Sequence, residues 1–200
     1  MLEVEGVSYR HTRHPWLFKN LSLKISAGEI VGLYGKSGSG KTTLAQIMAG
    51  YLKPKEGIVK VNRRKVKSTG PYSVQLVWQP PEKAINPRRR MKKVLAEAGA
   101  VDPRILDALG IAPSWMTRYP SELSGGKLQR FCVARALGPN TEDLIADEMT
   151  TMLNAITQAQ IWHTTLQLAE KRSVGVLVIR HDNQLLDRIC DRVIDFNQSH

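Results

Sequence analysis

The fold of this chain is decided by a short stretch, LYGKSGSGKTTL, at residues 33–44. Three glycines stand between the apolar run IVGLY (residues 30–34) and the apolar segment TTLAQIMAG (residues 42–50). The first apolar run predicts a short buried strand, and the second predicts a helix. Ordering a glycine-rich connection costs conformational entropy and adds almost nothing to a core. The glycines therefore indicate a function that the backbone itself performs between the strand and the helix.

That function is phosphate binding. Glycines let consecutive backbone N–H groups converge on anionic oxygens, and the helix N-terminus adds its positive dipole end there. Lys41 supplies a full charge, and the Thr42 hydroxyl can ligate Mg²⁺. A glycine-rich turn is the alternative, but the full match to G-x-x-x-x-G-K-[ST] with correct flanks favours a nucleoside triphosphate. The residues predicted to bind it are Gly35, Lys36, Ser37, Gly38, Ser39, Gly40, Lys41, Thr42 and Thr43.

Two adjacent acids end the predicted strand in DLIADE, residues 143–148. Asp147 at the carboxyl end of a strand in such a fold can hold Mg²⁺, and Glu148 is placed to orient and activate a water. Successive residues of a continuing strand face opposite ways, so the strand must end here for both carboxylates to reach the loop mouth. Strand-end acids also cap following helices. Beside a phosphate loop, the nucleotide role is favoured.

A second glycine pair opens a predicted helix in LSGGKLQR, residues 123–130. Ser124 fits an N-cap, and the free N–H groups of Gly125 and Gly126 would make a second anion site. An ordinary capped helix is the alternative. A second anion site in one chain makes sense if it contacts the nucleotide held by another chain.

The remaining pattern predicts an α/β fold with a mainly parallel sheet, an N-terminal antiparallel layer and an inserted helical subdomain. Early strands are predicted at residues 2–9, 17–26, 58–61 and 72–78, of which the first three or four form the antiparallel layer. Helices are predicted at 91–99 and 103–110, with no strand until 143. Strands and helices then alternate, as in a parallel sheet. We expect residues 1–87 and 124–200 to form the α/β core and residues 88–123 to form the helical subdomain.

Composition is that of a folded protein with an excess of basic residues. The 200 residues are 42% hydrophobic and 24% charged, with a net charge of +11 that allows an anionic partner without selecting one. Cys132 and Cys190 do not form a metal-type or redox pair. We expect no signal peptide, since the N-terminus lacks an apolar core, and no bilayer span, since no apolar run approaches ~18 residues.

The phosphate loop, LSGGKLQR and LIADE, in this order, resemble an ABC transporter ATPase over essentially the whole chain. The resemblance implies ATP hydrolysis with Mg²⁺, by two chains that hold each ATP between one phosphate loop and the other chain's LSGG. It implies that Gln79 contacts Mg²⁺ and the attacking water, that His181 contacts the γ-phosphate and that Tyr9 stacks on adenine. Each of these residues also has a structural alternative. Gln79 could hydrogen-bond at a strand end, His181 could be a core histidine, and Tyr9 could be an ordinary strand aromatic. Trp16 is a rival adenine platform.

Two residues depart from the pattern of this family. After Glu148 the family reads P-T-S-A-L-D, whereas this chain reads MTTMLN at residues 149–154, so Asn154 replaces an aspartate. Asparagine keeps the hydrogen bonding but loses the charge. Lys127 stands where the family has glutamine, and it would either assist near a γ-phosphate or point to solvent. Both changes affect contacts with the second chain, so we expect this chain's own site to hydrolyse ATP.

The segment QPPEKAINPRRRM, residues 79–91, resembles importers for peptides, nickel and metal-chelating opines. This resemblance implies two membrane-spanning permeases, a second ATPase chain that is different or identical, and indirectly an extracellular substrate-binding protein. It places the chain at the cytoplasmic face of the cell membrane as a peripheral subunit, with nickel, cobalt or oligopeptides as cargo. A basic cluster follows in Arg88, Arg89, Arg90, Lys92 and Lys93. It forms a solvated charged face, a contact with anionic lipid or a contact with nucleic acid.

The rival class is a soluble ABC-type ATPase that acts on nucleic acid or ribosomes. Such proteins generally carry two ATPase halves or long insertions. This chain has one half, so no nucleic-acid partner is expected.

Overall fold

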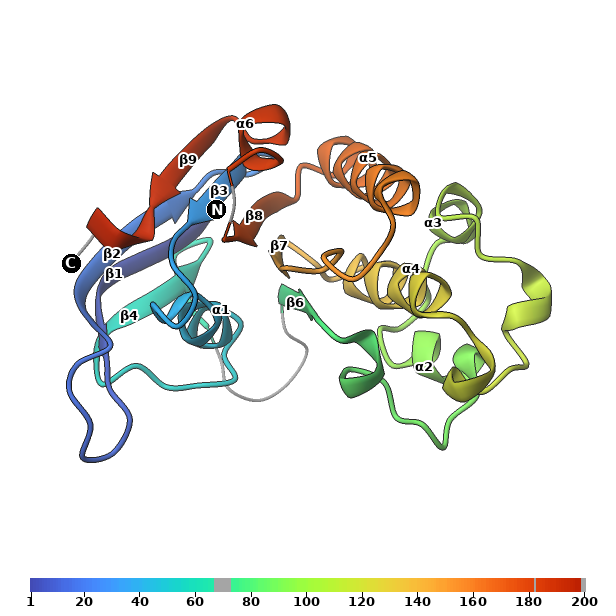
Figure 1. Ribbon diagram of the computed structural model, residues 1–200, viewed down its shortest axis with the longest axis horizontal. Helices are drawn as coiled ribbons and strands as arrows, with labels where there is room; N and C mark the ends of the chain where they lie inside the picture. The colour runs from blue at the N-terminus through green and yellow to red at the C-terminus, as the bar shows by residue number, and fades with distance from the viewer. Residues whose placement is uncertain (67–72, 182, 199–200) are drawn as a thin grey trace.

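The chain folds into an antiparallel sheet and a parallel sheet, with helices packed on the parallel one (Figure 1). The structure is a computed structural model that describes residues 1–66, 73–181 and 183–198. The antiparallel sheet has the order β2-β1-β4-β5, and the parallel sheet has the order β6-β7-β8-β3-β9. This arrangement confirms the predicted α/β fold with an antiparallel N-terminal layer.

The strands are β1 (Leu2–Tyr9), β2 (Phe18–Ile25), β3 (Ile30–Tyr34), β4 (Glu56–Val61), β5 (Arg64–Lys65), β6 (Val74–Trp78), β7 (Asp143–Asp147), β8 (Gly175–Arg180) and β9 (Arg192–Asp195). The α-helices are α1 (Lys41–Met48), α2 (Met91–Ala96), α3 (Pro103–Ala108), α4 (Gly125–Ala136), α5 (Ala155–Lys171) and α6 (Leu186–Ile189). The short 3-10 helices are η1 (Pro81–Lys83), η2 (Pro113–Trp115), η3 (Pro120–Glu122) and η4 (Phe196–Gln198).

Of the three or four strands predicted for the antiparallel layer, the first three belong to it, and its fourth strand is one that was not predicted. The predicted strand at residues 72–78, of which residue 72 lies outside the described residues, is β6 and pairs in parallel with β7. The fourth place belongs to β5, which turns back on β4 through Asn62 and Arg63, with φ of 46° and 65°. Two residues are too short for a periodic signal, and arginine is not typical of left-handed turn positions.

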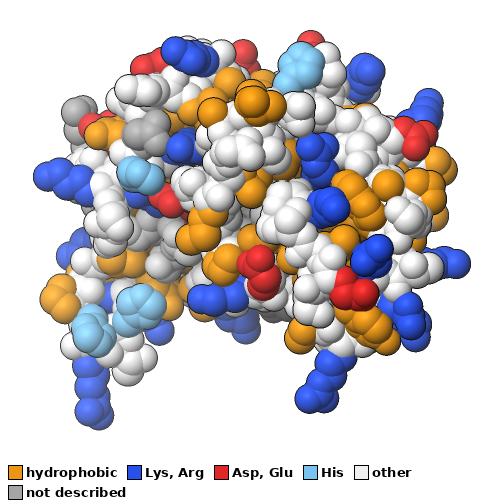
Figure 2. Space-filling model, turned by 45° about the vertical axis from the view of Figure 1, so that its right-hand side comes forward, with side chains coloured by type: hydrophobic (Ala, Val, Ile, Leu, Met, Phe, Trp, Pro, Cys, Tyr) orange, Lys and Arg blue, Asp and Glu red, His pale blue; other side chains and the backbone are white. Residues whose placement is uncertain are grey.

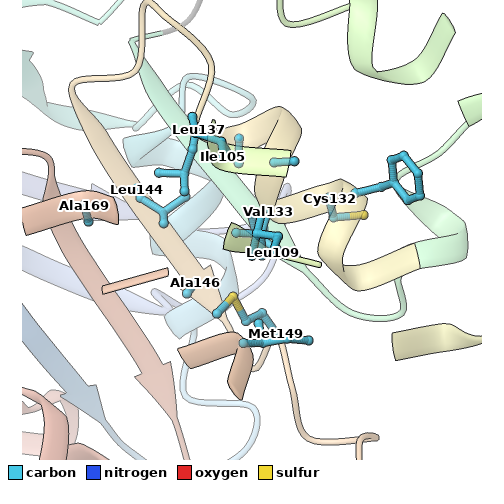
Figure 3. Close-up of a cluster of buried hydrophobic side chains, with 14 of the residues drawn as sticks. Ile105, Leu109, Cys132, Val133, Leu137, Leu144, Ala146, Met149 and Ala169 are labelled. Atoms are coloured by element: carbon cyan, nitrogen blue, oxygen red, sulfur yellow. The ribbon is translucent and has the colours of Figure 1, made fainter. Parts of the chain in front are cut away.

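Alternate residues of the parallel strands enter two separate hydrophobic cores. Leu144 and Ala146 of β7 pack with α4 and α5 in the core of Figure 3, whereas Ile145 packs with α1 and the antiparallel sheet. Neighbouring β8 divides in the same way between Val178 and Ile179. Because side chains of a strand alternate between faces, successive apolar residues of these fully buried strands contribute to one core and then the other. The sheet is thereby packed between two layers.

The segment between β6 and β7 contains helices and no strand in the described chain, as predicted. Helix α2 begins with hydrogen bonds from the Met91 and Lys92 amides to the carbonyls of Arg118 and Met116, at 2.9 Å each. Met91 also packs into the same core as α4. Residues 88–123 therefore share their core with the parallel sheet, and their division as a separate subdomain stays a prediction.

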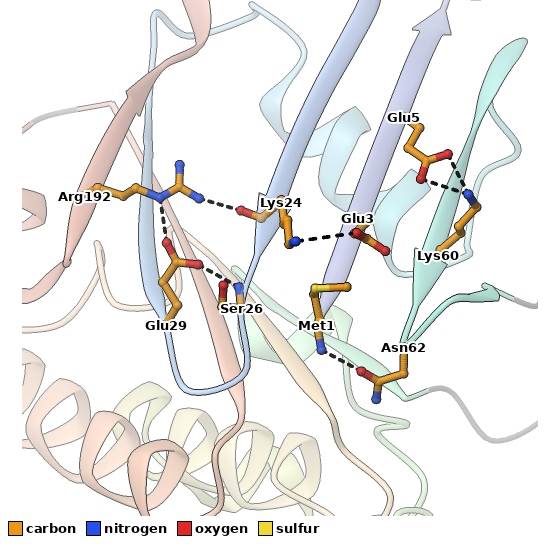
Figure 4. A network of polar contacts seen from close by, with 9 residues as sticks. All are labelled: Met1, Glu3, Glu5, Lys24, Ser26, Glu29, Lys60, Asn62 and Arg192. Carbon is orange, nitrogen blue, oxygen red and sulfur yellow. Dashed lines mark hydrogen bonds and ion pairs between the residues drawn. The ribbon is translucent and has the colours of Figure 1, made fainter.

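Ion pairs and amide contacts cover the outer side of the antiparallel sheet (Figure 4). Lys60 and Glu5 lie 2.7 Å apart on β4 and β1, and Arg192 lies 2.6 Å from Glu29. The second pair joins β9 to the turn before β3, because Glu29 also accepts from the Ser26 amide. Exposed pairs of this kind each contribute only about 0–1 kcal/mol to stability.

The described part of the chain holds no helix with the length and hydrophobicity that a membrane span requires.

Asp143 at the start of β7 is a buried carboxyl group and makes stability depend on pH. Its side chain is 1% exposed, and neither oxygen has a hydrogen-bond partner within the described residues. Burial raises the pKa of Asp143 to about 6; the N-terminal amine lowers it and Glu142 raises it further. An unfolded aspartate titrates near ~3.9. The protonated carboxyl group therefore makes its full contribution to the unfolding free energy below about pH 4. This contribution is lost as pH rises through about 6.

We expect Asp143→Asn to remove this dependence. Between about pH 4 and pH 8 the native chain should lose about 2 kcal/mol of unfolding free energy that the variant keeps. Urea denaturation at several pH values measures the difference between the two profiles. Parallel profiles for the native chain and the variant would contradict the assignment.

Candidate nucleotide site

The predicted phosphate loop joins β3 to α1 and has the backbone that the sequence requires. Gly38 and Gly40 adopt left-handed φ of 79° and 106°, which glycine reaches without strain. A Cβ on Gly40 would lie 2.8 Å from Leu17 Cγ, so a larger residue would also collide. Helix α1 begins at Lys41, directly after the loop. Its first N–H groups have no partner within the helix and can bind an anion.

Lys41 extends back into the loop instead of into solvent. Its side chain is buried, and Nζ donates to the carbonyl oxygens of Gly35 at 2.6 Å and Lys36 at 2.8 Å. Burial lowers the pKa of Lys41, while Glu148 and Asp147 raise it. A cation is thus held at the centre of a loop whose backbone N–H groups also favour negative charge.

Other features of the loop fit a bound triphosphate. The hydroxyl oxygen of Ser39 is buried and has no hydrogen-bond partner among the described residues, which leaves it available to a phosphate oxygen. Ser37 and Gly38 are exposed, and Thr43 follows within α1. Thr42 hydrogen-bonds the Asp147 carboxylate, which places a hydroxyl and a carboxylate together, the oxygen ligands that Mg²⁺ prefers. Burial raises the pKa of Asp147, and the bond from Thr42 lowers it.

Three neighbouring strands bring their predicted site residues to the same edge of the parallel sheet. In register, Trp78 of β6 pairs with Asp147 of β7, and Asp147 pairs with Ile179 of β8. Gln79 follows Trp78 directly, and His181 follows one residue after β8 ends. The structure therefore gathers Gln79, Asp147, Glu148 and His181 at the strand ends. A hollow of about 250 Å³ is lined there by Thr42, Trp78, Gln79, Pro80, Asp147, Glu148, Thr151 and Met152.

Glu148 has an unusual backbone that turns its side chain toward the hollow. Its φ is 50°, in the left-handed region, and its N–H donates to the Ile179 carbonyl at 3.1 Å. Strand β7 ends one residue earlier, at Asp147. Glu148 is therefore outside the alternation of the strand, which is the condition under which both carboxylates were expected to reach the loop mouth. His181 Nδ1 lies 2.8 Å from Glu148 Oε1. This contact fixes the carboxylate beside the imidazole.

The second glycine motif opens α4 but does not line this hollow. Ser124 is the N-cap residue, and Gly125 and Gly126 are the first two helical residues. Ser124 makes no side-chain cap hydrogen bond, so its hydroxyl is not used to cap its own helix. Lys127, whose direction was left open, places Nζ 4.7 Å from the centre of the Trp115 ring. The lysine thus packs on an aromatic face in its own chain.

Tyr9 lies in the N-terminal core. Its side chain is 9% exposed, and its ring lies against Phe18 and edge-on to His11. Trp16 is half-buried, and the cations of Arg10 and Lys19 lie over its ring at 4.7 and 5.3 Å. Both rings have partners within this chain, so adenine stacking by either one stays a prediction.

Asn154 caps α5, which accounts for the residue at this position. Its Oδ1 accepts from the Thr157 amide at 2.9 Å, an N-cap contact. We expect Asn154→Ala to lower the unfolding free energy by about 1 kcal/mol, because a helix N–H loses its acceptor. Asn154→Asp, which keeps the acceptor, should leave stability nearly unchanged. Denaturant titration compares the two, and an equal loss in both variants would contradict the capping role.

The sequence reasoning missed Thr151 and Met152, which also line the hollow. The hydroxyl of Thr151 donates to Gln79 Oε1, across a wide separation in sequence. Met152 is 77% exposed. Both residues follow Glu148 closely, so the signal was their place in the turn after the acid pair.

The fold and the loop between β3 and α1 define the class of P-loop nucleoside triphosphatases. Residues 18–151 match the ABC transporter family. The nickel import ATP-binding protein NikE of Escherichia coli O6:K15:H31 (strain 536 / UPEC) is 34% identical, over 94% of this chain and 77% of the relative. NikE of Escherichia coli (strain K12) is 31% identical, over 97% and 82%. The chain therefore belongs to the ABC transporter family and is an ATP-hydrolysing member of it, as its motifs predicted.

Solved structures agree with this assignment. The dimeric, post-hydrolysis ATP-binding cassette MJ0796 bound to ADP and Pi superimposes with a TM-score of 0.82 at 26% identity, covering 98% of this chain and 94% of that one. The cbiO1 protein of Clostridium perfringens, part of the cbiONQ transporter complex, gives a TM-score of 0.82 at 22% identity, over 97% and 83%. The second likeness supports the fold alone.

Proposed function

We propose that this chain is the ATPase subunit of an importer whose cargo is nickel. The observation that carries the proposal is that Thr42, Gln79, Asp147 and Glu148 line one hollow. Lys41 is held in the adjoining loop, and His181 lies against Glu148, as expected of an enzyme that transfers a phosphoryl group to water. The nickel cargo is supported by the relatives named above, which are nickel import ATP-binding proteins. Cobalt and oligopeptides are the other cargoes that the sequence allows.

In this mechanism the loop of residues 35–42 and Lys41 hold the phosphates of ATP. Thr42 and Asp147, with Gln79, would hold Mg²⁺, which when bound would neutralise charge on the phosphate oxygens. Glu148 takes up a proton from the attacking water, and His181, beside it, steadies the γ-phosphate. Catalysis rests mainly on positioning and on charge stabilisation.

A second ATPase chain and two permeases complete the proposed assembly, with this chain peripheral at the cytoplasmic face of the membrane. A groove of about 530 Å³, lined by Trp78 directly before Gln79, supports the permease contact. Tyr51, 51% exposed, stacks on Trp78 in this groove, and Cys132 and Arg135 of α4 also line it. An exposed aromatic beside an open groove is typical of a protein contact. Because Trp78 precedes Gln79, a partner seated there would act directly on the site.

The basic residues near this groove are only partly free. Arg89 pairs with Glu97 at 2.9 Å, and Arg90 lies 4.8 Å from the Tyr119 ring centre. Arg88, Lys92 and Lys93 are exposed. Figure 2 shows lysine and arginine side chains projecting from several parts of one face, so positive charge is not confined to this segment. Their role in docking to permease or lipid is part of the proposal.

Transport by cells tests the cargo. In the host, deletion of the gene for this chain should abolish high-affinity nickel accumulation, and the native gene should restore it while a Glu148→Gln gene should not. Loss of cobalt or oligopeptide uptake, with nickel uptake intact, would replace nickel as the cargo. Normal uptake of all three, together with salt-dependent binding of the purified chain to RNA or DNA, would overturn the importer proposal.

A further inference from the structure

One hydroxyl group connects Gln79 to the turn that follows the acid pair. Thr151 Oγ1 donates to Gln79 Oε1 and lies 3.2 Å from the Glu148 carbonyl oxygen. A hydroxyl has a single proton, so it can serve one of these acceptors at a time. The contact to Gln79 is the shorter of the two. Both side chains are partly buried and both line the hollow.

The turn itself does not need this hydroxyl. The Thr151 amide already donates to the Glu148 carbonyl oxygen at 3.2 Å, and the Leu153 amide donates to Thr150 at 3.0 Å. The neighbouring hydroxyl of Thr150 is used differently, since it accepts from Trp162 Nε1 and Gln158 Nε2 at 2.9 Å each. Backbone bonds and the Thr150 contacts therefore hold the turn and α5. The Thr151 hydroxyl is left to act on the Gln79 side chain.

A glutamine side chain has several rotatable bonds and loses considerable freedom when its amide must point in one direction. The bond from Thr151 fixes the position of Oε1, and both residues line the hollow that Thr42 and Asp147 also line. An amide oxygen has two lone pairs, so Oε1 can accept from Thr151 and still offer an oxygen ligand. The hydroxyl thus holds the Gln79 amide in one orientation and leaves its oxygen able to bind a hard cation.

We propose that Thr151 is a positioning residue that orients the Gln79 amide oxygen for Mg²⁺ bound with ATP. The inference rests on the proposed function, which assigns Gln79 to the metal.

The test compares Thr151→Val, which removes the hydroxyl at nearly constant volume, with Thr151→Ser, which keeps it. Both are made in a Glu148→Gln background so that hydrolysis does not disturb binding. Binding of a fluorescent ATP analogue is measured in EDTA and during titration with Mg²⁺. Thr151→Val should bind the analogue normally in EDTA. It should need about three- to ten-fold more Mg²⁺ for the half-maximal effect, as loss of one hydrogen bond implies. Thr151→Ser should match its parent.

Two outcomes would overturn the inference: a Mg²⁺ titration unchanged in Thr151→Val, or the same impairment in Thr151→Ser. A third comparison tests whether the Thr151 hydroxyl acts on the Glu148 carbonyl oxygen instead of on Gln79. In a Gln79→Ala background Thr151→Val should have no further effect, and an undiminished effect there would assign the hydroxyl to the turn and overturn the inference. If the parent binds nucleotide and only these differences fail, the proposed function stands. If the parent binds no nucleotide at all, the proposed function and the inference fall together.

Discussion

Replacing Glu148 by glutamine should lower the ATP turnover of the purified chain by about 10²- to 10⁴-fold, the usual contribution of a general base. The amide has the shape of the carboxylate but cannot take up the proton of the attacking water. The amide can donate as well as accept, so it can still hydrogen-bond with His181, whose Nδ1 lies 2.8 Å from Glu148 Oε1, and the local geometry should persist. Steady-state phosphate release measures turnover, and binding of an ATP analogue should change by less than about two-fold.

Glu170→Gln is the matched control, because it makes the same chemical change on an exposed face of α5. It should hydrolyse ATP at the native rate. Near-native turnover in Glu148→Gln would refute the assignment of Glu148 as the base. An ATP-dependent dimer of this slow variant, seen as an increase in mass, would indicate that two identical chains can form the ATP sandwich.

Lys41→Ala is expected to weaken ATP binding about 10- to 100-fold, the effect of losing a charge-assisted contact to phosphate. The structure gives the reason for a large effect. The ammonium group is buried and is already held at the centre of the loop by the Gly35 and Lys36 carbonyl oxygens. A cation that is already fixed within the loop gains more from binding a phosphate than one that must be ordered first.

Lys55→Ala removes an exposed lysine outside the site and serves as the control for net charge. Affinity should be measured at two salt concentrations, because a general loss of positive charge would matter less as salt rises. Equal affinities for Lys41→Ala and Lys55→Ala would refute the assigned role of Lys41. A normal thermal transition in Lys41→Ala would exclude unfolding as the cause of lost binding.

The sequence predicted those parts of the molecule in which local pattern and structure coincide. The apolar run before the glycines is β3, and the stop after Asp147 is the true end of β7. What could not be predicted was pairing between distant strands. Residues 72–78 read equally well as an edge of the antiparallel layer, and only the ladder to β7 assigns them to the other sheet. Strand β5 exists because of a turn through Asn62 and Arg63, not because of its own residues.

In the site, too, the sequence predicted local motifs but not contacts between distant residues. The loop and the acid pair are short continuous motifs, so their chemistry can be read directly from residue order. The Thr151 contact to Gln79 joins two loops that only the sheet brings together. Lys127 was predicted to act on a phosphate or to face solvent, and its actual partner, Trp115, belongs to a distant short helix. Side-chain contacts of this kind depend on tertiary packing, which single-sequence patterns do not encode.

The left-handed backbone at Glu148 implies that thermal stability and ATP turnover favour different residues at this position. Such a conformation disfavours most side chains by about 1–2 kcal/mol, whereas glycine adopts it freely. A Glu148→Gly chain could therefore be more resistant to heat than the native chain while it no longer hydrolyses ATP. Selection for thermal tolerance alone would drift toward glycine here, and only selection for activity would keep the acid. Screens for variants with higher thermal stability should therefore measure ATP hydrolysis as well as melting temperature.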